Sequence, residues 1–138
     1  MPQVRELMTE SPRTVPPDAS AVDAAKVMQN EDAGVVPIVE DDGRLIGVVT
    51  DRDIALRVVA EGREPDSTKV AEIASQNLAT VDPQQDIDEA LRLMAEHQVR
   101  RLPVVEEDGR LVGILAQADI AQAGHDALTG DTVQRISQ

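Results

Sequence analysis

The sequence predicts an α/β fold, α+β-like in the order of its elements, that is built from two copies of one small unit. The chain has 138 residues, which is enough for a domain with a hydrophobic core. A shift of 66 residues places residues 4–55 on residues 70–121 without a gap. Within each copy, short β-branched runs alternate with stretches of helical periodicity, in the order β-α-β-β-α.

The internal match runs through turns and helices alike, which favours a duplication. The identical segments are Thr14-Val15 with Thr80-Val81, Pro37 with Pro103, Asp42–Leu45 with Asp108–Leu111, and Asp53–Ala55 with Asp119–Ala121. The period is longer than the roughly 20–50 residues of solenoid repeats. A unit of about 55 residues buries little of its own surface. We therefore expect the two copies to pack through their sheets with pseudo-twofold symmetry.

The elements of each copy follow from local signals. A short amphipathic turn, VRELM or VAEIA, comes first, and an extended Thr-Val segment follows. A helix is then expected to open at Ser20 and Asp23 in the first copy, and at a capping box of Asp86 and Glu89 in the second. Its predicted apolar stripes are Ala21, Ala24, Ala25 and Met28 in the first copy, and Ile87, Ala90, Leu91 and Met94 in the second.

Two strands joined by an Asp-Gly turn follow in each copy, and a closing helix ends the copy. In the first copy Gly62 is the expected C-cap of that helix. The domains predicted from these elements are a first repeat at 1–62, a linker at 63–69, a second repeat at 70–125 and a C-terminal tail at 126–138.

The composition narrows the function classes. The chain has 13 Lys and Arg against 26 Asp and Glu, a formal net charge of −13, which repels nucleic acid and anionic membranes. It has no Cys, so disulfides, thiolate metal ligands and a Cys nucleophile are excluded. Without aromatic residues no base can stack on an aromatic ring. The sequence lacks a signal-peptide pattern and an apolar run of about 20 residues, so we expect a cytoplasmic protein outside the membrane.

The ordered set of motifs resembles the CBS domain, the cystathionine β-synthase type of repeat. It comprises a Thr-Val segment, a helix, a strand with an internal proline, the D-G-R-L turn, and the pattern GVVTDRDI that opens a helix. Two such units in tandem resemble a CBS pair, or Bateman module. The segments TDRDIALRVVAEG and EHQVRRLPVV resemble the stand-alone bacterial CBS-pair proteins of the hypoxic-response type.

This resemblance implies regulation rather than catalysis. CBS pairs bind adenosine-containing ligands (AMP, ADP, ATP or S-adenosylmethionine) in clefts between the repeats, and they often form disc-like homodimers. No cofactor is expected apart from such a regulatory ligand, and no metal site is expected. The ligand-binding residues that it implies here are Thr14, Val15, Val36, Pro37, Thr50, Arg52 and Asp53 in the first copy, and Thr80, Val81, Arg100, Arg101, Leu102, Pro103 and Asp119 in the second.

Two interpretations of Thr50 and Asp53 remain open on the residues alone. A carboxylate accepts the two hydroxyl donors of a ribose, and Arg52 adds a cation beside it. Alternatively, Thr50 is an ordinary N-cap and Asp53 is a favourable negative charge in the first helical turn. In the second copy Ala116 replaces the threonine, so we expect that site to bind ligand more weakly or not at all.

The basic pair Arg100-Arg101 also allows two interpretations. Arginine suits forked phosphate recognition, but these side chains could instead pair with the abundant carboxylates. A minor alternative is a local patch for nucleic acid. The two histidines, His97 and His125, show no metal-ligand spacing, so structural or solvent roles are expected for them.

The sequence contains no catalytic signature, phosphate-binding loop or G-x-G-x-x-G motif, so we do not expect an enzyme. The function predicted from the sequence is that of a stand-alone CBS-pair regulator that binds an adenosine-containing ligand. The alternative is a CBS dimer that acts as a protein-interaction module without any ligand, with an unknown protein partner.

Overall fold

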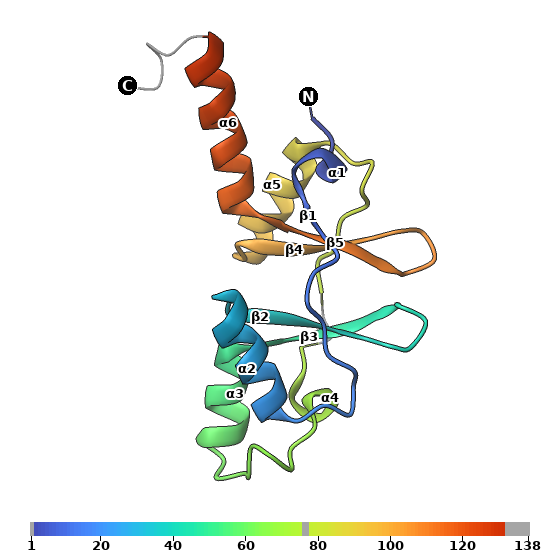
Figure 1. Cartoon of the computed structure of the whole chain (residues 1–138), viewed down its shortest axis with the longest axis vertical. Coiled ribbons are helices and arrows are strands. Elements are labelled where there is room, and N and C mark those ends of the chain that lie inside the picture. Colours follow the sequence, from blue (N-terminus) through green and yellow to red (C-terminus); the bar gives the residue numbers. More distant parts are fainter. Residues whose placement is uncertain (1, 76–77, 132–138) are drawn as a thin grey trace. The chain divides into compact units, whose positions relative to one another are not determined.

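A computed structural model describes residues 2–75 and 78–131, and the side chains up to residue 124. The chain forms two compact units, each containing one β-hairpin. The β2–β3 unit comprises Pro12–Leu78 and Glu107–Leu111. The β4–β5 unit comprises Met1–Ser11, Ala79–Glu106 and Val112–Gln138. The mixed helix and strand composition that the sequence predicts is confirmed (Figure 1).

The β2–β3 unit has an antiparallel hairpin at its centre. Strand β2 (Val35–Val39) pairs with β3 (Leu45–Thr50), and a single residue is bridged at each outer edge, Val15 parallel to β2 and Ser75 antiparallel to β3. Helices α2 (Ala21–Glu31) and α3 (Asp51–Ile54) lie on one face of this hairpin (Figure 1). A π-helical segment, η1 (Ala55–Val59), continues α3, and α4 (Val70–Ile73) precedes Ser75.

The β4–β5 unit repeats this arrangement. Its sheet has the order β1-β5-β4, from Thr9–Glu10, Leu111–Ala116 and Arg101–Val105. Val81 is bridged parallel to β4 at Val104, as Val15 is to β2 at Ile38. Helices α5 (Ile87–His97) and α6 (Gln117–Asp131) lie on one face of the sheet, and α1 (Val4–Leu7) packs against α6 (Figure 1).

Each compact unit includes the leading segment of the other sequence repeat. The segment with α1 and β1 begins the first repeat, yet β1 pairs with β5 of the second. Likewise Ser75 follows α4 at the start of the second repeat and is bridged to Val48 of β3. The compact units and the sequence repeats therefore do not consist of the same residues. The domain boundaries predicted from the repeats, and the packing of the copies through their sheets, stay predictions.

Aliphatic side chains form the core of each unit, as the absence of aromatic residues requires. Burying them provides the main favourable contribution to folding. The buried residues are Val15, Ala19, Ala21, Ala24, Met28, Val36, Ile38, Val49, Val58, Val70 and Ile73 in the β2–β3 unit, and Val4, Val81, Ile87, Ala90, Met94, Leu102, Val104 and Leu115 in the β4–β5 unit.

Two expected features of the helices are wrong. Ala25 and Leu91 are exposed, because the buried face of each helix follows the first, fourth and eighth helical positions. Asp86 is the N-cap of α5, but its side chain accepts no capping hydrogen bond, and Glu89 turns instead to Arg92. The capping box at Ser20 and Asp23 is confirmed.

The ends of the closing helices also differ between the copies. In the first copy the predicted C-cap at Gly62 is wrong, because the helix is capped by Ala60. Gly62 lies two residues beyond it, has φ +68° and donates its N–H to the Val59 carbonyl. In the second copy α6 continues to Asp131, beyond the expected end of the repeat, and residues 132–138 lie outside the described residues. Among the described residues, no helix combines the length and the apolar character needed to cross a membrane.

Candidate functional site

Four of the predicted ligand-binding residues of the first copy, Thr14, Val15, Val36 and Pro37, lie together. The Val15 N–H donates to the Pro37 carbonyl at 3.0 Å, and the Val39 N–H donates to the Val15 carbonyl at 3.0 Å. These bonds place the Thr14-Val15 segment along β2, beside Val36 and Pro37. Val15 and Val36 are buried, so their side chains belong to the core as well as to the predicted site.

The second copy has the same arrangement around its strand proline. The Val81 N–H donates to the Pro103 carbonyl at 3.1 Å, and the Val105 N–H donates to the Val81 carbonyl at 2.9 Å. Thr80-Val81 therefore lies along β4, beside Leu102 and Pro103. Leu102 and Val81 are buried in the core of the β4–β5 unit.

The Thr50–Asp53 junction forms a complete capping box at the start of α3. The Asp53 N–H donates to Thr50 Oγ1 at 3.0 Å, and the Thr50 N–H donates to Asp53 Oδ2 at 2.9 Å. Both groups that the ligand hypothesis requires are thus engaged in local structure. The capping interpretation is confirmed, and it leaves open a further role for the carboxylate.

Asp53 is a buried charged residue, with 7% of its surface exposed. Its neighbours compensate the charge. The Ser75 hydroxyl donates to both carboxylate oxygens, at 3.3 Å and 3.4 Å, and a guanidinium nitrogen of Arg57 lies 3.7 Å from Oδ1. Burying a carboxylate is costly unless such partners are present, which explains why these groups gather around it.

Sequence reasoning missed Arg57 and Ser75 as members of this site. Arg57 also donates to the carbonyls of Ile73 and Ala74, at 2.9 Å and 3.4 Å, so one side chain joins η1 to the segment before Ser75. The repeat held a usable signal, because the 66-residue shift places Thr9 on Ser75, a hydroxyl on a hydroxyl. The repeat gave no such signal for Arg57, because the second copy has Ala123 at the corresponding position.

A second carboxylate lies at the same junction. The Asp51 N–H donates to the Gly34 carbonyl at 2.9 Å, which ties the start of α3 to the start of β2. A Cβ built at Gly34 would lie 2.8 Å from Asp51 Oδ2, so any larger residue there would require this carboxylate to move. The side chain of Arg52 is exposed and has no hydrogen bond or ion pair among the residues that the structure describes.

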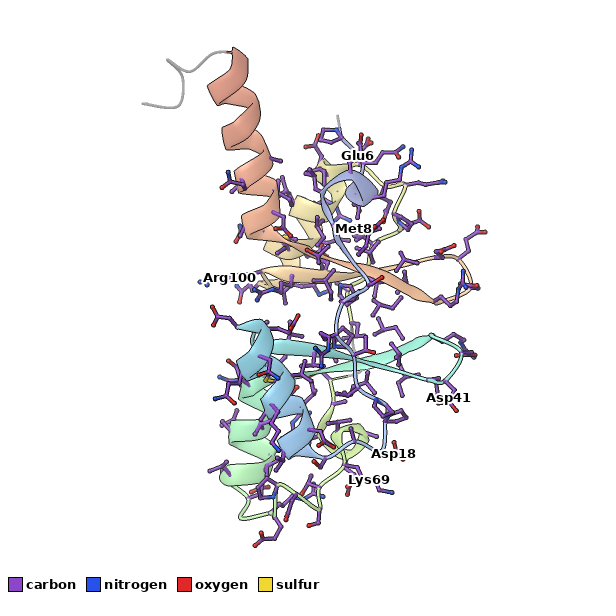
Figure 2. All side chains as sticks on the ribbon, viewed as in Figure 1. Glu6, Met8, Asp18, Asp41, Lys69 and Arg100 are labelled. Atoms are coloured by element: carbon purple, nitrogen blue, oxygen red, sulfur yellow. The ribbon has the colours of Figure 1, made fainter. Side chains whose placement is uncertain are left out.

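The corresponding junction of the second copy carries different charges. The Gln117 N–H donates to the Arg100 carbonyl at 2.8 Å, the same backbone contact as in the first copy. Arg100 lies just before β4, at the end of the hairpin opposite its turn (Figure 2). Neither Arg100 nor Arg101 pairs with a carboxylate in the described part of the chain, so the alternative of ion pairing finds no support there. Asp119 lies in the first turn of α6.

A hollow of the β2–β3 unit lies beside α2 rather than at the junction. Its volume is about 500 Å³, and its walls carry mixed charge. The residues lining it are Arg13, Val15, Pro16, Asp18, Ala19, Asp23, Lys26, Val27 and Asn30. Of the predicted site residues only Val15 takes part. A second hollow of about 330 Å³ lies near the β2–β3 turn, where Figure 2 shows Asp41, and it too lacks Thr50 and Asp53.

The described residues contain no group of three or more His, Cys, Asp or Glu that could hold a metal ion. His97 is exposed at the end of α5, and the side chain of His125 lies outside the described residues. The expected absence of a metal site stays a prediction.

The geometry of these elements is that of a duplicated CBS unit, and comparison with known proteins agrees. The CBS domain family matches residues 4–60 and again residues 70–126. The chain belongs to the CBS domain family and contains two of its domains in tandem.

Its relatives include other CBS-pair proteins. It is 40% identical to the CBS domain-containing protein YhcV of Bacillus subtilis over 142 residues, which cover 99% of both chains. It is 41% identical to hypoxic response protein 1 of Mycobacterium tuberculosis over 122 residues, 88% of this chain and 85% of the other. The resemblance to the hypoxic-response type is therefore confirmed.

Solved structures of similar proteins contain several ligands. Hypoxic response protein I, crystallised with two coordinated zinc ions, matches with a TM-score of 0.81 and 40% identity, over 88% of this chain and 98% of the other. CBSX2 in complex with AMP matches with a TM-score of 0.78 and 26% identity, over 91% of this chain and 97% of the other. The CBS pair of protein MJ0100 was crystallised in complex with 5′-methylthioadenosine and S-adenosyl-L-methionine. It matches with a TM-score of 0.80 and 26% identity, over 92% of this chain and 98% of the other.

Proposed function

We propose that this chain is a regulatory CBS pair that binds an adenosine-containing ligand at the Thr50–Asp53 junction. One observation carries the proposal: Asp53 is a buried carboxylate whose two contacts to Ser75 are long, at 3.3 Å and 3.4 Å. An ionised carboxylate can accept about four hydrogen bonds, so the Asp53 carboxylate can accept further hydrogen bonds besides the one from the Thr50 N–H. The two hydroxyls of a ribose would replace the Ser75 hydroxyl and fill that capacity.

Two similar structures support the ligand class. CBSX2 was crystallised with AMP, and the MJ0100 pair with 5′-methylthioadenosine and S-adenosylmethionine. These ligands share an adenosine and differ in what the ribose 5′ carbon carries. The shared part suits Asp53 and the Thr14-Val15 segment. Nothing in this arrangement requires a bond to be made or broken, so the role that we propose is regulation by binding.

Calorimetric titration of the whole chain with AMP, ATP, 5′-methylthioadenosine and S-adenosylmethionine tests the proposal. The variant Asp53→Asn keeps an oxygen for the Thr50 N–H but removes the charge, and we expect it to lose most of the affinity. Asp23→Asn is a matched control, because Ser20 and Asp23 form the same capping box at α2. If no member of the panel binds the wild type at millimolar concentration, the proposal is wrong.

A second candidate function is a homodimeric interaction module that needs no ligand. It is favoured by Leu56 and Val59, which are 49% and 70% exposed on the η1 segment. A CBS-CP12 protein that resembles this chain is hexameric, so assembly occurs among its relatives. Light scattering with and without AMP and 5′-methylthioadenosine separates the candidates. A dimer that Val59→Glu dissociates and that ignores both ligands would favour the module.

A further inference from the structure

The strand-to-helix junctions of the two copies can be compared directly, because they share a backbone contact and differ in the charge of their side chains. Asp51 donates its N–H to the Gly34 carbonyl, and Gln117 donates its N–H to the Arg100 carbonyl. In the first copy the side chains at these two positions are a carboxylate and a hydrogen atom. In the second they are a neutral amide and a guanidinium. The duplication therefore preserved the backbone contact, while the combined charge of the two side chains is negative in the first copy and positive in the second.

The carboxylate of Asp51 is held at that place. Its Oδ1 accepts the Arg52 N–H at 2.8 Å, and its Oδ2 occupies the space that a Cβ at Gly34 would fill. The cations nearby do not form an ion pair with it. Arg57 is directed to Asp53 and to the carbonyls of Ile73 and Ala74, and the exposed Arg52 side chain has no ion pair in the described part of the chain.

Asp51 and Asp53 belong to one helical turn, where residues two apart have Cα atoms about 5–6 Å apart. A ribose held by Asp53 would carry its 5′ substituent within about 10 Å of Asp51, which is one Debye length at 0.1 M salt. A phosphate there is repelled by a fixed carboxylate. A neutral thioether is unaffected, and a sulfonium is attracted.

We infer that Asp51 makes the Thr50–Asp53 site selective for adenosine conjugates without a phosphate, such as 5′-methylthioadenosine, over AMP. This inference rests on the proposed function, since it needs adenosine to bind at Asp53. Asp51 is the specificity-determining residue, and Gly34 is the position that makes room for it. The first site then senses a thioether or sulfonium nucleoside rather than the phosphorylated adenine nucleotides.

The direct test is the affinity ratio of 5′-methylthioadenosine to AMP, measured by calorimetry at low salt. The wild type should prefer 5′-methylthioadenosine. Asp51→Asn keeps an acceptor for the Arg52 N–H, so it should raise AMP affinity about tenfold and leave 5′-methylthioadenosine affinity unchanged. Asp66→Asn, which removes one exposed carboxylate from the loop before Ser67, should change neither affinity. The gain at Asp51 should shrink as salt is added.

A double variant transfers the charges of the second junction to the first. Gly34→Arg alone would push its Cβ into the Asp51 carboxylate, so the change is made together with Asp51→Gln. This pair reproduces the Arg100 and Gln117 combination that the second copy already tolerates. We expect AMP affinity to rise beyond that of Asp51→Asn, and the preference for 5′-methylthioadenosine to disappear.

The failures of the two proposals are distinguishable. If AMP and 5′-methylthioadenosine bind the wild type equally and Asp51→Asn changes neither, adenosine binding stands and the selectivity by Asp51 is wrong. If Asp53→Asn leaves both affinities intact, the ligand is not held by this carboxylate and both proposals are wrong. If neither ligand binds the folded wild type or the folded Asp51→Asn variant, both are likewise overturned.

Discussion

The hydroxyl of Ser75 donates to both carboxylate oxygens of Asp53, although the two residues lie 22 positions apart in the chain. Ser75 is also fixed by its backbone, which exchanges hydrogen bonds with Val48 at 2.9 Å and 3.2 Å. The Asp53 carboxylate of the first repeat is therefore hydrogen-bonded to a segment that begins the second repeat. A ligand that replaces Ser75 at Asp53 would break this hydrogen bond, so binding would change a contact between the two repeats.

Ser75→Ala should lower stability without lowering ligand affinity. The variant removes one long, bifurcated hydrogen bond to a buried carboxylate, so we expect a loss of about 0.5–1.5 kcal/mol in the free energy of unfolding. Adenosine ligands should bind at least as tightly as before, because the hydroxyl that competes for Asp53 is gone. Urea denaturation and calorimetry measure the two effects separately.

Ser67→Ala provides the control for this change. Its hydroxyl also makes one long bond, to the Glu64 carbonyl at 3.4 Å, but the residue is exposed and distant in sequence from the junction. It should alter stability little and affinity not at all. A loss of affinity in Ser75→Ala would show that the serine itself contacts the ligand, contrary to the replacement that we propose.

The cap and the ligand roles of Thr50 can be separated by two variants. Thr50→Ser keeps an oxygen for the Asp53 N–H, whereas Thr50→Ala removes it and should cost about 1 kcal/mol of unfolding free energy. The reciprocal change is Ala116→Thr, which places a hydroxyl three residues before Asp119 and should stabilise the chain by a similar amount. Thermal denaturation of the three variants checks the signs. An unchanged thermal midpoint in Ala116→Thr would mean that the introduced threonine does not form a capping box with Asp119.

Much of this arrangement could be predicted from the sequence, because it depends on local signals that occur twice. The position of the hairpins follows from the proline-containing strands and the Asp-Gly turns, whose glycines have φ +88° at Gly43 and +89° at Gly109. The capping box at Thr50 follows from the types and spacing of two residues. Each of these is decided within a few positions of chain.

What could not be predicted depends on contacts between distant segments. The bonds of Arg57 to the segment before Ser75 arise only when the chain returns to β3. The missing box at Asp86 has one distant and one local cause. The backbone there is bridged to Gln3, and the Glu89 side chain instead accepts from Arg92, three residues along the same helix. Hydrogen bonding to Arg92 lowers the pKa of Glu89.

Arg57→Lys should destabilise the β2–β3 unit even though the charge is kept. One guanidinium nitrogen, Nη1, donates to both carbonyls and faces Asp53, and the shorter lysine side chain would not bring its ammonium to the same position. Because the side chain is half exposed, its ion pair contributes little, and we expect a loss of about 1 kcal/mol, mostly from the carbonyl bonds. Arg52→Lys changes a side chain without a described partner and should leave the urea midpoint unmoved. Equal effects of the two variants would contradict this account.

Stability should depend on pH through Glu72. The Lys69 N–H donates to its carboxylate at 2.8 Å, and Arg63 donates to it at 2.8 Å, so the pKa of Glu72 is lowered from its ordinary value of 4.5, first by the backbone bond and then by the guanidinium. A carboxyl whose pKa is lower in the folded chain binds fewer protons there than in the unfolded chain. Its contribution to stability is therefore complete above pH 4.5 and is lost as the pH falls through the lowered folded value.

Urea midpoints of the wild type and Glu72→Gln, compared from pH 7 down to pH 3, test this dependence. The difference between the two proteins should be largest at neutral pH and should close as the pH falls below 4.5, because the wild-type carboxyl becomes as neutral as the amide. Glu61→Gln, which removes another exposed carboxylate from the same unit, is the control for the loss of one charge. A Glu72→Gln difference that stays constant over the whole range would show that Lys69 and Arg63 do not stabilise the charged form.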